Sequence, residues 1–295
     1  MGKENFKSGF VSIVGKPNVG KSTLMNALVG DNLSIITSKA QTTRHRIMGI
    51  LTGQDFQIVY SDTPGILNPK YSLQKSMMSF VSSSLEDADL VLYVVELMEK
   101  QEEEELLEKI ANSKTPALLV INKTDLNKGS RLKDKVDYWQ LLYPGIEIIS
   151  VSALQKDNID MLLARILELM PVHPPYFPAD TLTDKPEKFF ASEMIREQIF
   201  KYYQQEVPYS TEVEISSFKE DDDIIRMRAE IYVERKSQKG IIIGKGGESI
   251  KAVGIGARKQ MEEFFGKQVH LETFVKVEQD WRKKDKLLKK FGYKH

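Results

Sequence analysis

Apolar and polar positions follow two different patterns along the chain. Up to about Met170, short apolar runs alternate with stretches of helical spacing, which is typical of a doubly wound α/β domain with a mostly parallel sheet. Beyond that point the predicted order is helix, strand, strand, helix, helix, strand, which indicates a smaller α+β domain. A length of 295 residues also favours about two domains.

The first pattern predicts six strands and several helices. The strands are expected at Phe10–Val14, Arg46–Leu51, Phe56–Tyr60, Leu90–Val95, Ala117–Ile121 and Glu147–Ser150. The helices are expected at Lys21–Val29, Glu102–Ala111, Lys133–Leu142 and Asn158–Leu169. The second pattern predicts a helix at Lys188–Gln205, strands at Thr211–Phe218, Ile224–Glu234 and Val269–Val277, and a helix that ends near Phe265.

A proline-rich segment separates the two patterns. Pro171–Pro178 has the sequence PVHPPYFP, and four prolines in eight residues exclude a regular helix or a central strand. We therefore expect a first domain at 1–170, a stiff linker at 171–187, a second domain at 188–278 and a basic tail at 279–295.

Composition narrows the class of protein. The chain has no cysteine, which excludes disulfides, cysteine zinc sites and thiol catalysis, and its four histidines lack the spacing of metal ligands. No apolar run approaches the ~18–20 residues of a membrane span, and the N-terminus lacks a signal-peptide core, so we expect a cytoplasmic protein. The net charge is zero, but residues 224–295 carry 18 Lys and Arg against 9 Asp and Glu. That imbalance suggests a polyanionic partner for the second domain.

A phosphate-binding loop follows the first strand. Gly15–Thr23, GKPNVGKST, matches G-x-x-x-x-G-K-[ST], in which glycines let backbone N–H groups curl round phosphates. Lys21 supplies a cation, the Ser22 hydroxyl can bind Mg²⁺, and the helix that begins there adds its positive end. A bare glycine turn is the ordinary alternative, which the preceding strand and following helix disfavour.

A second motif selects the base. Asn122–Asp125, NKTD, follows the fifth strand, and the Asp125 carboxylate can accept two hydrogen bonds from guanine, whereas adenine offers no matching donors. Lys123 can lay its alkyl stem along the base. Val151–Leu154, VSAL, follows the next strand, where the backbone amides of Ser152 and Ala153 could meet guanine O6; in isolation both motifs are also compatible with ordinary turns.

Two further motifs are expected to sense the terminal phosphate. Ala40–His45, AQTTRH, can donate a threonine hydroxyl to the metal, and we favour Thr43 over Thr42. Asp62–Leu67, DTPGIL, ends a strand with an Asp that can hold a metal-bound water. Many GTPases place a Gln after this Gly to orient the attacking water, but here the residue is Ile66.

The second domain contains a candidate RNA clamp. Gly244–Gly247, GKGG, lies between two helical segments and matches G-x-x-G, whose glycines allow close approach of a nucleic-acid strand while Lys245 neutralises phosphate. A helix-to-helix turn is the ordinary alternative. The tail Trp281–His295 mixes basic and aromatic residues, which indicates either nucleic-acid contact or a solvated helix face anchored by Trp281 and Phe291.

Together these motifs resemble those of P-loop, Ras-like GTPases related to translation factors. KPNVGKST with TTRH and DTPGI is similar to the Era branch, the second domain resembles a type II KH domain, and the resemblance covers essentially the whole chain. The resemblance implies that Asp62 holds Mg²⁺ through a water and that Gly65 offers its N–H to the γ-phosphate. It also implies that Asn18 occupies a position associated with activation by K⁺.

The predicted function is a slow GTPase switch whose nucleotide state, GTP or GDP, controls RNA binding. The resemblance, and not composition, implies binding near the 3′ end of 16S rRNA and a role in assembly of the small (30S) ribosomal subunit by a monomer. One alternative is a nucleotide-gated binding module in which hydrolysis is incidental, and Ile66 is its best support. A third idea, peripheral contact with the inner membrane, depends only on the basic tail.

The candidate residues fall into four groups. The catalytic candidates are Asn18, Lys21, Thr43, Asp62 and Gly65, and the Mg²⁺ ligands are Ser22, Thr43 and Asp62. The GTP-binding candidates are Gly15, Lys16, Pro17, Asn18, Val19, Gly20, Lys21, Ser22, Thr23, Asp62, Thr63, Pro64, Gly65, Asn122, Lys123, Asp125, Ser152 and Ala153. The RNA-binding candidates are Ile243, Gly244, Lys245, Gly246, Gly247, Ser249 and Lys251.

Overall fold

The structure, a computed structural model, describes residues 5–37, 39–100 and 105–294. The chain divides into two compact units. The first comprises Met1–Ser34, Thr43–Asn68 and Met77–Asp184, and the second comprises Ile35–Thr42, Pro69–Ser76 and Lys185–His295. None of the described helices combines the length and the apolar character that a membrane crossing needs.

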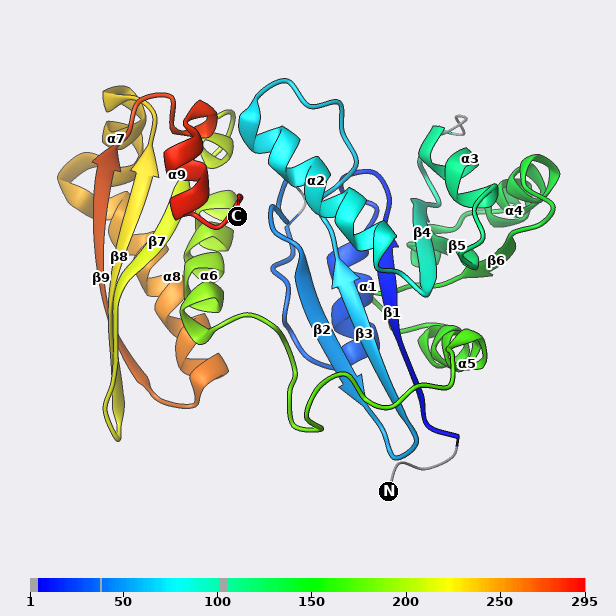
Figure 1. Ribbon diagram of the computed structural model, residues 1–295. Coiled ribbons are helices and arrows are strands. Elements are labelled where there is room, and N and C mark those ends of the chain that lie inside the picture. Colours follow the sequence, from blue (N-terminus) through cyan, green and yellow to red (C-terminus); the bar gives the residue numbers. More distant parts are fainter. Residues whose placement is uncertain (1–4, 38, 101–104, 295) are drawn as a thin grey trace. The chain divides into compact units, whose positions relative to one another are not determined.

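The first unit is built on a six-stranded sheet with the order β2-β3-β1-β4-β5-β6 (Figure 1). Edge strand β2 is antiparallel to β3, and the other neighbouring pairs are parallel. The strands are β1 Lys7–Val14, β2 Ile47–Thr52, β3 Phe56–Asp62, β4 Leu90–Glu96, β5 Ala117–Asn122 and β6 Glu147–Ser150. This architecture confirms the predicted α/β class and all six strands.

Helices cover both faces of this sheet, and Figure 1 shows α1 and α2 on opposite faces. They are α1 Lys21–Val29, α2 Ser72–Glu86, α3 Glu105–Ala111, α4 Arg131–Leu142 and α5 Ile159–Leu169. Helix α2 is not among the predicted helices, and the predicted start of α3 at Glu102 lies outside the described residues. Tyr93 of β4 packs in one core cluster with Leu107 of α3 and Trp139 of α4. Its neighbours Leu92 and Val94 are equally buried on the other face, because alternate residues of a strand point to opposite sides.

The proline-rich segment is bound to the first unit. The side-chain amide of Gln57 on β3 binds it through both of its polar atoms: Oε1 accepts the N–H groups of Tyr176 and Phe177 at 2.8 and 2.9 Å, and Nε2 donates to the Phe177 carbonyl at 2.9 Å. Further along, the Ile50 N–H donates to the Leu182 carbonyl at 2.8 Å. Residues as far as Asp184 therefore group with the first unit.

The second unit has a three-stranded sheet with the order β7-β8-β9. Strands β7 and β8 are antiparallel, β8 and β9 are parallel, and helices α6 and α8 pack on each other. The elements are α6 Glu187–Tyr202, β7 Glu212–Glu220, β8 Ile224–Val233, α7 Lys236–Ile243, α8 Glu248–Phe265 and β9 Gln268–Val277. Their order confirms the predicted α+β arrangement of helix, strand, strand, helix, helix, strand.

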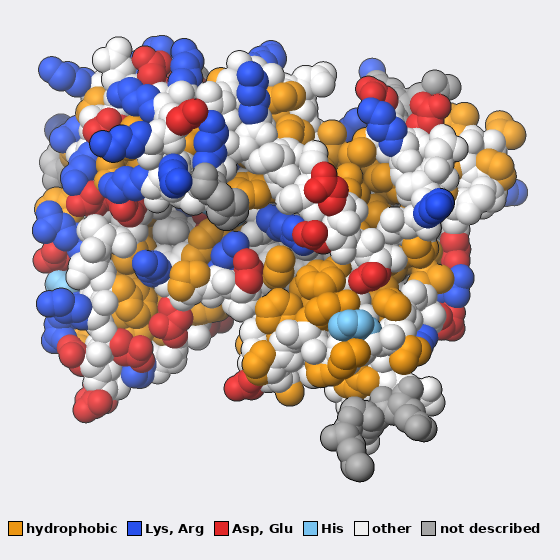
Figure 2. Space-filling view, in the orientation of Figure 1, with side chains coloured by type: hydrophobic (Ala, Val, Ile, Leu, Met, Phe, Trp, Pro, Cys, Tyr) orange, Lys and Arg blue, Asp and Glu red, His pale blue; other side chains and the backbone are white. Residues whose placement is uncertain are grey.

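The basic tail is anchored by aromatic residues. Trp281 is fully buried, its Nε1–H donates to the Ser210 carbonyl at 2.8 Å, and its ring meets Phe291 edge-on at 5.6 Å between centroids. The short helix α9, Asp285–Lys290, and Tyr293 complete this packing. The other side of the tail is exposed and basic, and Figure 2 shows Lys and Arg side chains gathered over this part of the second unit.

Removal of the Trp281 side chain should destabilise the second unit. We expect Trp281→Ala to lower the free energy of unfolding by about 3–5 kcal/mol, since it leaves a cavity and an unpaired carbonyl. Urea unfolding of the full chain measures the change. Lys286→Ala, at an exposed position of the same tail, is the control and should shift stability by less than about 0.5 kcal/mol. Equal stability of the two variants would contradict the anchoring role.

Candidate nucleotide site and nucleic-acid groove

The phosphate loop joins β1 to α1 and depends on two glycines. Gly15 has φ +148°, and a Cβ there would lie 2.2 Å from the Val94 carbonyl oxygen. Gly20 has φ +94°, and a Cβ there would lie 2.3 Å from Asn122 Nδ2. Both positions therefore exclude side chains, and the loop takes the tight path that places backbone N–H groups around a phosphate.

Lys21 is buried at the start of α1. Its ammonium donates to the carbonyls of Gly15 at 3.0 Å and Lys16 at 2.9 Å. Burial lowers the pKa of Lys21 to about 8, and the carboxylates of Asp62 and Glu99 act in the opposite direction. An incoming phosphate would add negative charge, raise this pKa again and stabilise the charged form, which is the electrostatic behaviour expected of a phosphate-binding lysine.

Three oxygen-bearing side chains meet beside the loop. Ser22 Oγ donates to Asp62 Oδ2 at 2.7 Å and lies 2.8 Å from Thr43 Oγ1, and Thr43 Oγ1 donates to Asp62 Oδ2 at 3.4 Å. Asp62 is fully buried and its Oδ1 lacks a hydrogen-bond partner among the described residues. Burial raises the pKa of Asp62 despite the hydrogen bond from Ser22 and the charge of Lys21. A hard cation with oxygen ligands, such as Mg²⁺, fits this set and would compensate the buried charge.

Thr42 and Thr43 have different surroundings. The Thr42 hydroxyl donates to the Lys39 carbonyl at 2.7 Å and lies 2.5 Å from Thr37 Oγ1, so it is engaged within its own loop. Only Thr43 of the two lies beside Ser22 and Asp62. The geometry therefore favours Thr43 as the metal ligand, in line with the preference from sequence.

The turn after β3 is held tightly against the phosphate loop. The Thr63 hydroxyl donates to the Ile13 carbonyl at 2.8 Å, and the Ile66 N–H donates to the Gly15 carbonyl at 3.1 Å. A Cβ on Gly65 would lie 2.7 Å from Pro17 Cα, so only glycine fits there. The Ile66 side chain packs against the apolar core cluster, which agrees with the inference that it does not orient a water.

Asn122 connects the base-selecting motif to its neighbours. Its Nδ2 donates to the Val19 carbonyl at 2.9 Å, and its Oδ1 accepts the N–H of Ala153 at 3.0 Å. Asp125 Oδ1 accepts the hydroxyl of Ser152 at 2.5 Å, an interaction that sequence reasoning missed. The structure therefore brings the three sequence-distant motifs together at the C-terminal edge of the sheet, where ligands bind in open α/β folds.

The amides of Ser152 and Ala153 have partners inside the protein. The Ser152 N–H donates to the Asp157 carbonyl at 3.1 Å, and the Ala153 N–H donates to Asn122 Oδ1. Donation to guanine O6 would require one of these bonds to lengthen or to be shared. The predicted contact therefore stays a prediction.

The G-x-x-G turn of the second unit is open on one side. Gly246 and Gly247 have φ +62° and +83°, and a Cβ on either would meet no atom within 4 Å. At Gly244 a Cβ would lie 2.2 Å from Ser249 Oγ, so that glycine is needed inside the turn. Gly246 and Gly247, the two outer glycines of the turn, instead leave their backbone accessible to a ligand.

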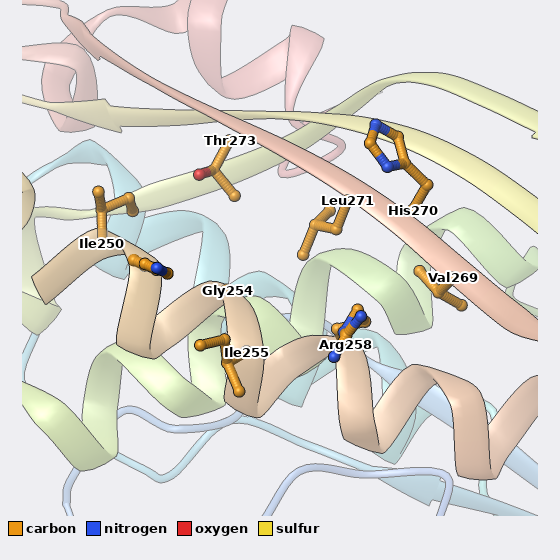
Figure 3. Close-up of a pocket in the computed structure, with 9 residues that line it drawn as sticks. Ile250, Gly254, Ile255, Arg258, Val269, His270, Leu271 and Thr273 are labelled. Atoms are coloured by element: carbon orange, nitrogen blue, oxygen red, sulfur yellow. The ribbon is translucent and has the colours of Figure 1, made fainter. Parts of the chain in front are cut away.

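A groove of about 450 Å³ lies beside this turn, between α8 and β9 (Figure 3). Sequence reasoning included Lys251 in this region but missed most of the other lining residues. They are Ile250, Gly254, Ile255, Arg258, Val269, His270, Leu271 and Thr273. The missed signal is the period of three to four on α8, which places Gly254 and Arg258 on the same face as Lys251.

Comparisons with known proteins match both units. A family model described as "50S ribosome-binding GTPase" matches residues 10–123, and a KH domain model matches residues 206–282. The chain is 47% identical to GTPase Era of Geotalea uraniireducens (strain Rf4), over 99% of this chain and 100% of that protein. It is 42% identical to GTPase Era of Staphylococcus haemolyticus (strain JCSC1435), over 97% of each chain.

Two solved structures are similar over nearly the whole length. One is a complex of Era with MgGDPNP and nucleotides 1506–1542 of 16S ribosomal RNA, and the other is an Aquifex aeolicus Era variant bound to GDP and aluminium fluoride. Each has a TM-score of 0.93 and 38% identity, and covers 98% of this chain and 100% of that chain.

The two neighbouring threonines should differ in their effect on GTP turnover. We expect Thr43→Ala to lower turnover by about tenfold to a hundredfold, because a hydrogen bond to a charged group contributes about 1.5–3 kcal/mol. Thr42→Ala is the matched control and should have a much smaller effect. Steady-state phosphate release at several Mg²⁺ concentrations measures both, and retained GDP binding shows that each variant is folded. A larger loss in Thr42→Ala would reverse the assignment.

Proposed function

This chain belongs to the Era family of GTPases, and we propose that it is a GTP-hydrolysing switch that binds 16S rRNA near its 3′ end and assists maturation of the small ribosomal subunit. The observation that carries the proposal is the open glycine pair Gly246–Gly247 beside the groove between α8 and β9. A chain that holds a GTPase unit and such a groove can couple nucleotide state to RNA binding.

The groove has the chemistry that a single RNA strand requires. Ile255 and Leu271 offer apolar surface on which bases can pack, and Arg258 lies in the same groove, where it can neutralise a phosphate (Figure 3). Lys251 also lines the groove and adds a second cation. From residue 224 onwards the chain has 18 basic and 9 acidic residues, and this positive balance adds long-range attraction for RNA. The solved Era complex with nucleotides 1506–1542 supports 16S rRNA as the partner.

The loop that contains Thr43 offers a route by which nucleotide binding in the first unit could affect the second unit. Ile35–Thr42 belongs to the second unit, whereas Thr43 belongs to the first, so the chain passes from one to the other at a single peptide bond. Within the second unit, the buried Arg196 pairs with Glu193 and donates to the Thr42 carbonyl. A shift of Thr43 when GTP binds would therefore act directly on a residue held by helix α6.

The hydrolytic site stabilises charge with Lys21 and with the backbone of the phosphate loop. When bound through Ser22, Thr43 and Asp62, Mg²⁺ would neutralise charge on the phosphates. The tight contact of Gly65 with Pro17 fixes the position of its N–H near the loop, where it would meet a γ-phosphate. Since Ile66 packs into the core, we propose that a K⁺ ion near Asn18 supplies additional charge stabilisation.

An alternative function is a nucleotide-gated RNA-binding module in which hydrolysis is incidental. The packing of Ile66 favours it, because an apolar side chain that packs against the core cannot orient a water. Single-turnover cleavage of GTP, with K⁺, Na⁺ and RNA varied separately, distinguishes the two. Cleavage that RNA or K⁺ accelerates supports the switch, whereas negligible cleavage under every condition supports the module.

Negative charge at the outer glycines should weaken RNA binding. We expect the double variant Gly246→Asp, Gly247→Asp to lower the affinity for a 16S 3′-end oligonucleotide by about tenfold or more, because each Asp tolerates positive φ but repels phosphate. Fluorescence anisotropy measures the affinity. GTP turnover without RNA should be unchanged.

Gly129→Asp is the matched control for backbone strain, since Gly129 also has positive φ and open space but lies in the first unit. It should bind the oligonucleotide as the parent protein does. Equal RNA binding by the double variant and this control would overturn the proposed RNA site.

Potassium should accelerate GTP hydrolysis through Asn18. This residue has φ +68°, so Asn18→Gly removes the side chain without backbone strain. We expect turnover in K⁺ to exceed that in Na⁺ by about tenfold or more in the parent protein, and this ratio to approach one in the variant. Phosphate release in matched chloride buffers measures it. A ratio near one in the parent protein would exclude the ion.

A further inference from the structure

Lys123 has an unusual backbone conformation next to the base-selecting aspartate. Its φ of +63° is uncommon for a lysine, and its N–H donates to Asn122 Oδ1 at 2.8 Å. The Lys123 backbone is therefore held in one conformation, which sets the direction in which its side chain starts. Its ammonium, however, lies at the end of four flexible methylene groups, so a second interaction is needed to fix the stem.

Glu96 supplies that interaction. Its Oε2 lies 2.7 Å from Lys123 Nζ, and the two side chains are only 24% and 31% exposed. Glu96 is the last residue of the buried strand β4, directly opposite Asn122 in the parallel register. The Leu97 N–H donates to the Asn122 carbonyl at 3.0 Å, which fixes the backbone on both sides of the ion pair.

We propose that Glu96 is a positioning residue for guanine-nucleotide binding, which holds the ammonium of Lys123 so that the lysine stem lies along the base. In this role Glu96 acts through the Lys123 ammonium, which it contacts at 2.7 Å. Its contribution is to restrict the lysine before the nucleotide arrives, so that less side-chain entropy is lost on binding.

The sign of the effect separates positioning from simple electrostatics. A guanine nucleotide is a polyanion, so removal of a nearby negative charge should strengthen its binding if long-range charge is all that matters. If Glu96 positions Lys123, the same removal should weaken binding. Glu99 provides the comparison for charge alone: its Oε1 pairs with Lys16 Nζ at 3.1 Å, and its Oε2 accepts the Glu96 N–H at 3.4 Å, a bond that the amide oxygen of a Gln can also accept.

The experiment measures dissociation constants of the full-length protein for GDP and GTP, with Mg²⁺ present, by calorimetry. We expect Glu96→Gln to raise both constants by the same factor, about twofold to fivefold, the range of a partly exposed ion pair. Glu96→Asp keeps the charge but shortens the reach by one methylene, and should weaken binding in the same direction. Glu99→Gln should leave the constants unchanged or lower them.

Inosine diphosphate tests whether the base site stays intact. It lacks the exocyclic amino group of guanine, from which Asp125 is expected to accept a hydrogen bond. The ratio of its dissociation constant to that of GDP therefore reports on this hydrogen bond to Asp125. We expect this ratio to be the same in Glu96→Gln as in the parent protein. Unchanged or tighter nucleotide binding in Glu96→Gln, or a collapse of the inosine ratio, would overturn the proposal.

Discussion

The carboxamide of Asn122 is the interaction on which the nucleotide site depends. It is 2% exposed, and it binds the Val19 carbonyl of the phosphate loop through Nδ2 and the Ala153 amide through Oδ1. Three loops that are far apart in sequence are thereby held by one planar group. The same group occupies the space that a side chain at position 20 would need, so the glycine of the phosphate loop and the asparagine of the base motif require each other.

The turn with the missing glutamine illustrates how strongly the backbone constrains this site. Gly65 lies against Pro17, and the amide of Ile66 is bound to the Gly15 carbonyl, so the chain has little freedom to rotate the next side chain outward. Ile66 packs on the apolar cluster between the sheet and its helices. Its apolar character is thus explained by packing against this cluster.

Sequence predicted the strands and glycine turns well because both depend on local properties. A short apolar run rich in β-branched residues, such as β4, favours a buried strand, and the positive φ values at Gly15 and Gly20, where a Cβ would also clash, favour glycine. Helix α2 was missed because its sequence, SLQKSMMSFVSSSLE, is rich in serine, a weak helix former, and tertiary packing overrides that preference.

Contacts between residues that are far apart in the chain could not be predicted from the sequence either. The proline-rich segment looked like a spacer, yet Gln57, more than 110 residues earlier, binds its backbone. The groove residues on β9 have the alternation of any strand, and only the packing of that strand against α8 shows which residues line the groove. The Ser152–Asp125 contact likewise becomes visible only once β5 and β6 are neighbours.

The electrostatics of the nucleotide site indicate which ligands it can bind. Lys21 and Asp62 are both buried, and burial shifts the pKa of each toward its neutral form: downward to about 8 for the lysine and upward for the aspartate. Each charge is therefore costly without a partner, and the two only partly compensate each other. A phosphate beside Lys21 and a divalent cation beside Asp62 would compensate both at once, because a metal–nucleotide pair carries charges of both signs. Nucleotide without metal, or metal without nucleotide, would leave one buried charge unmatched, so the site favours their joint binding.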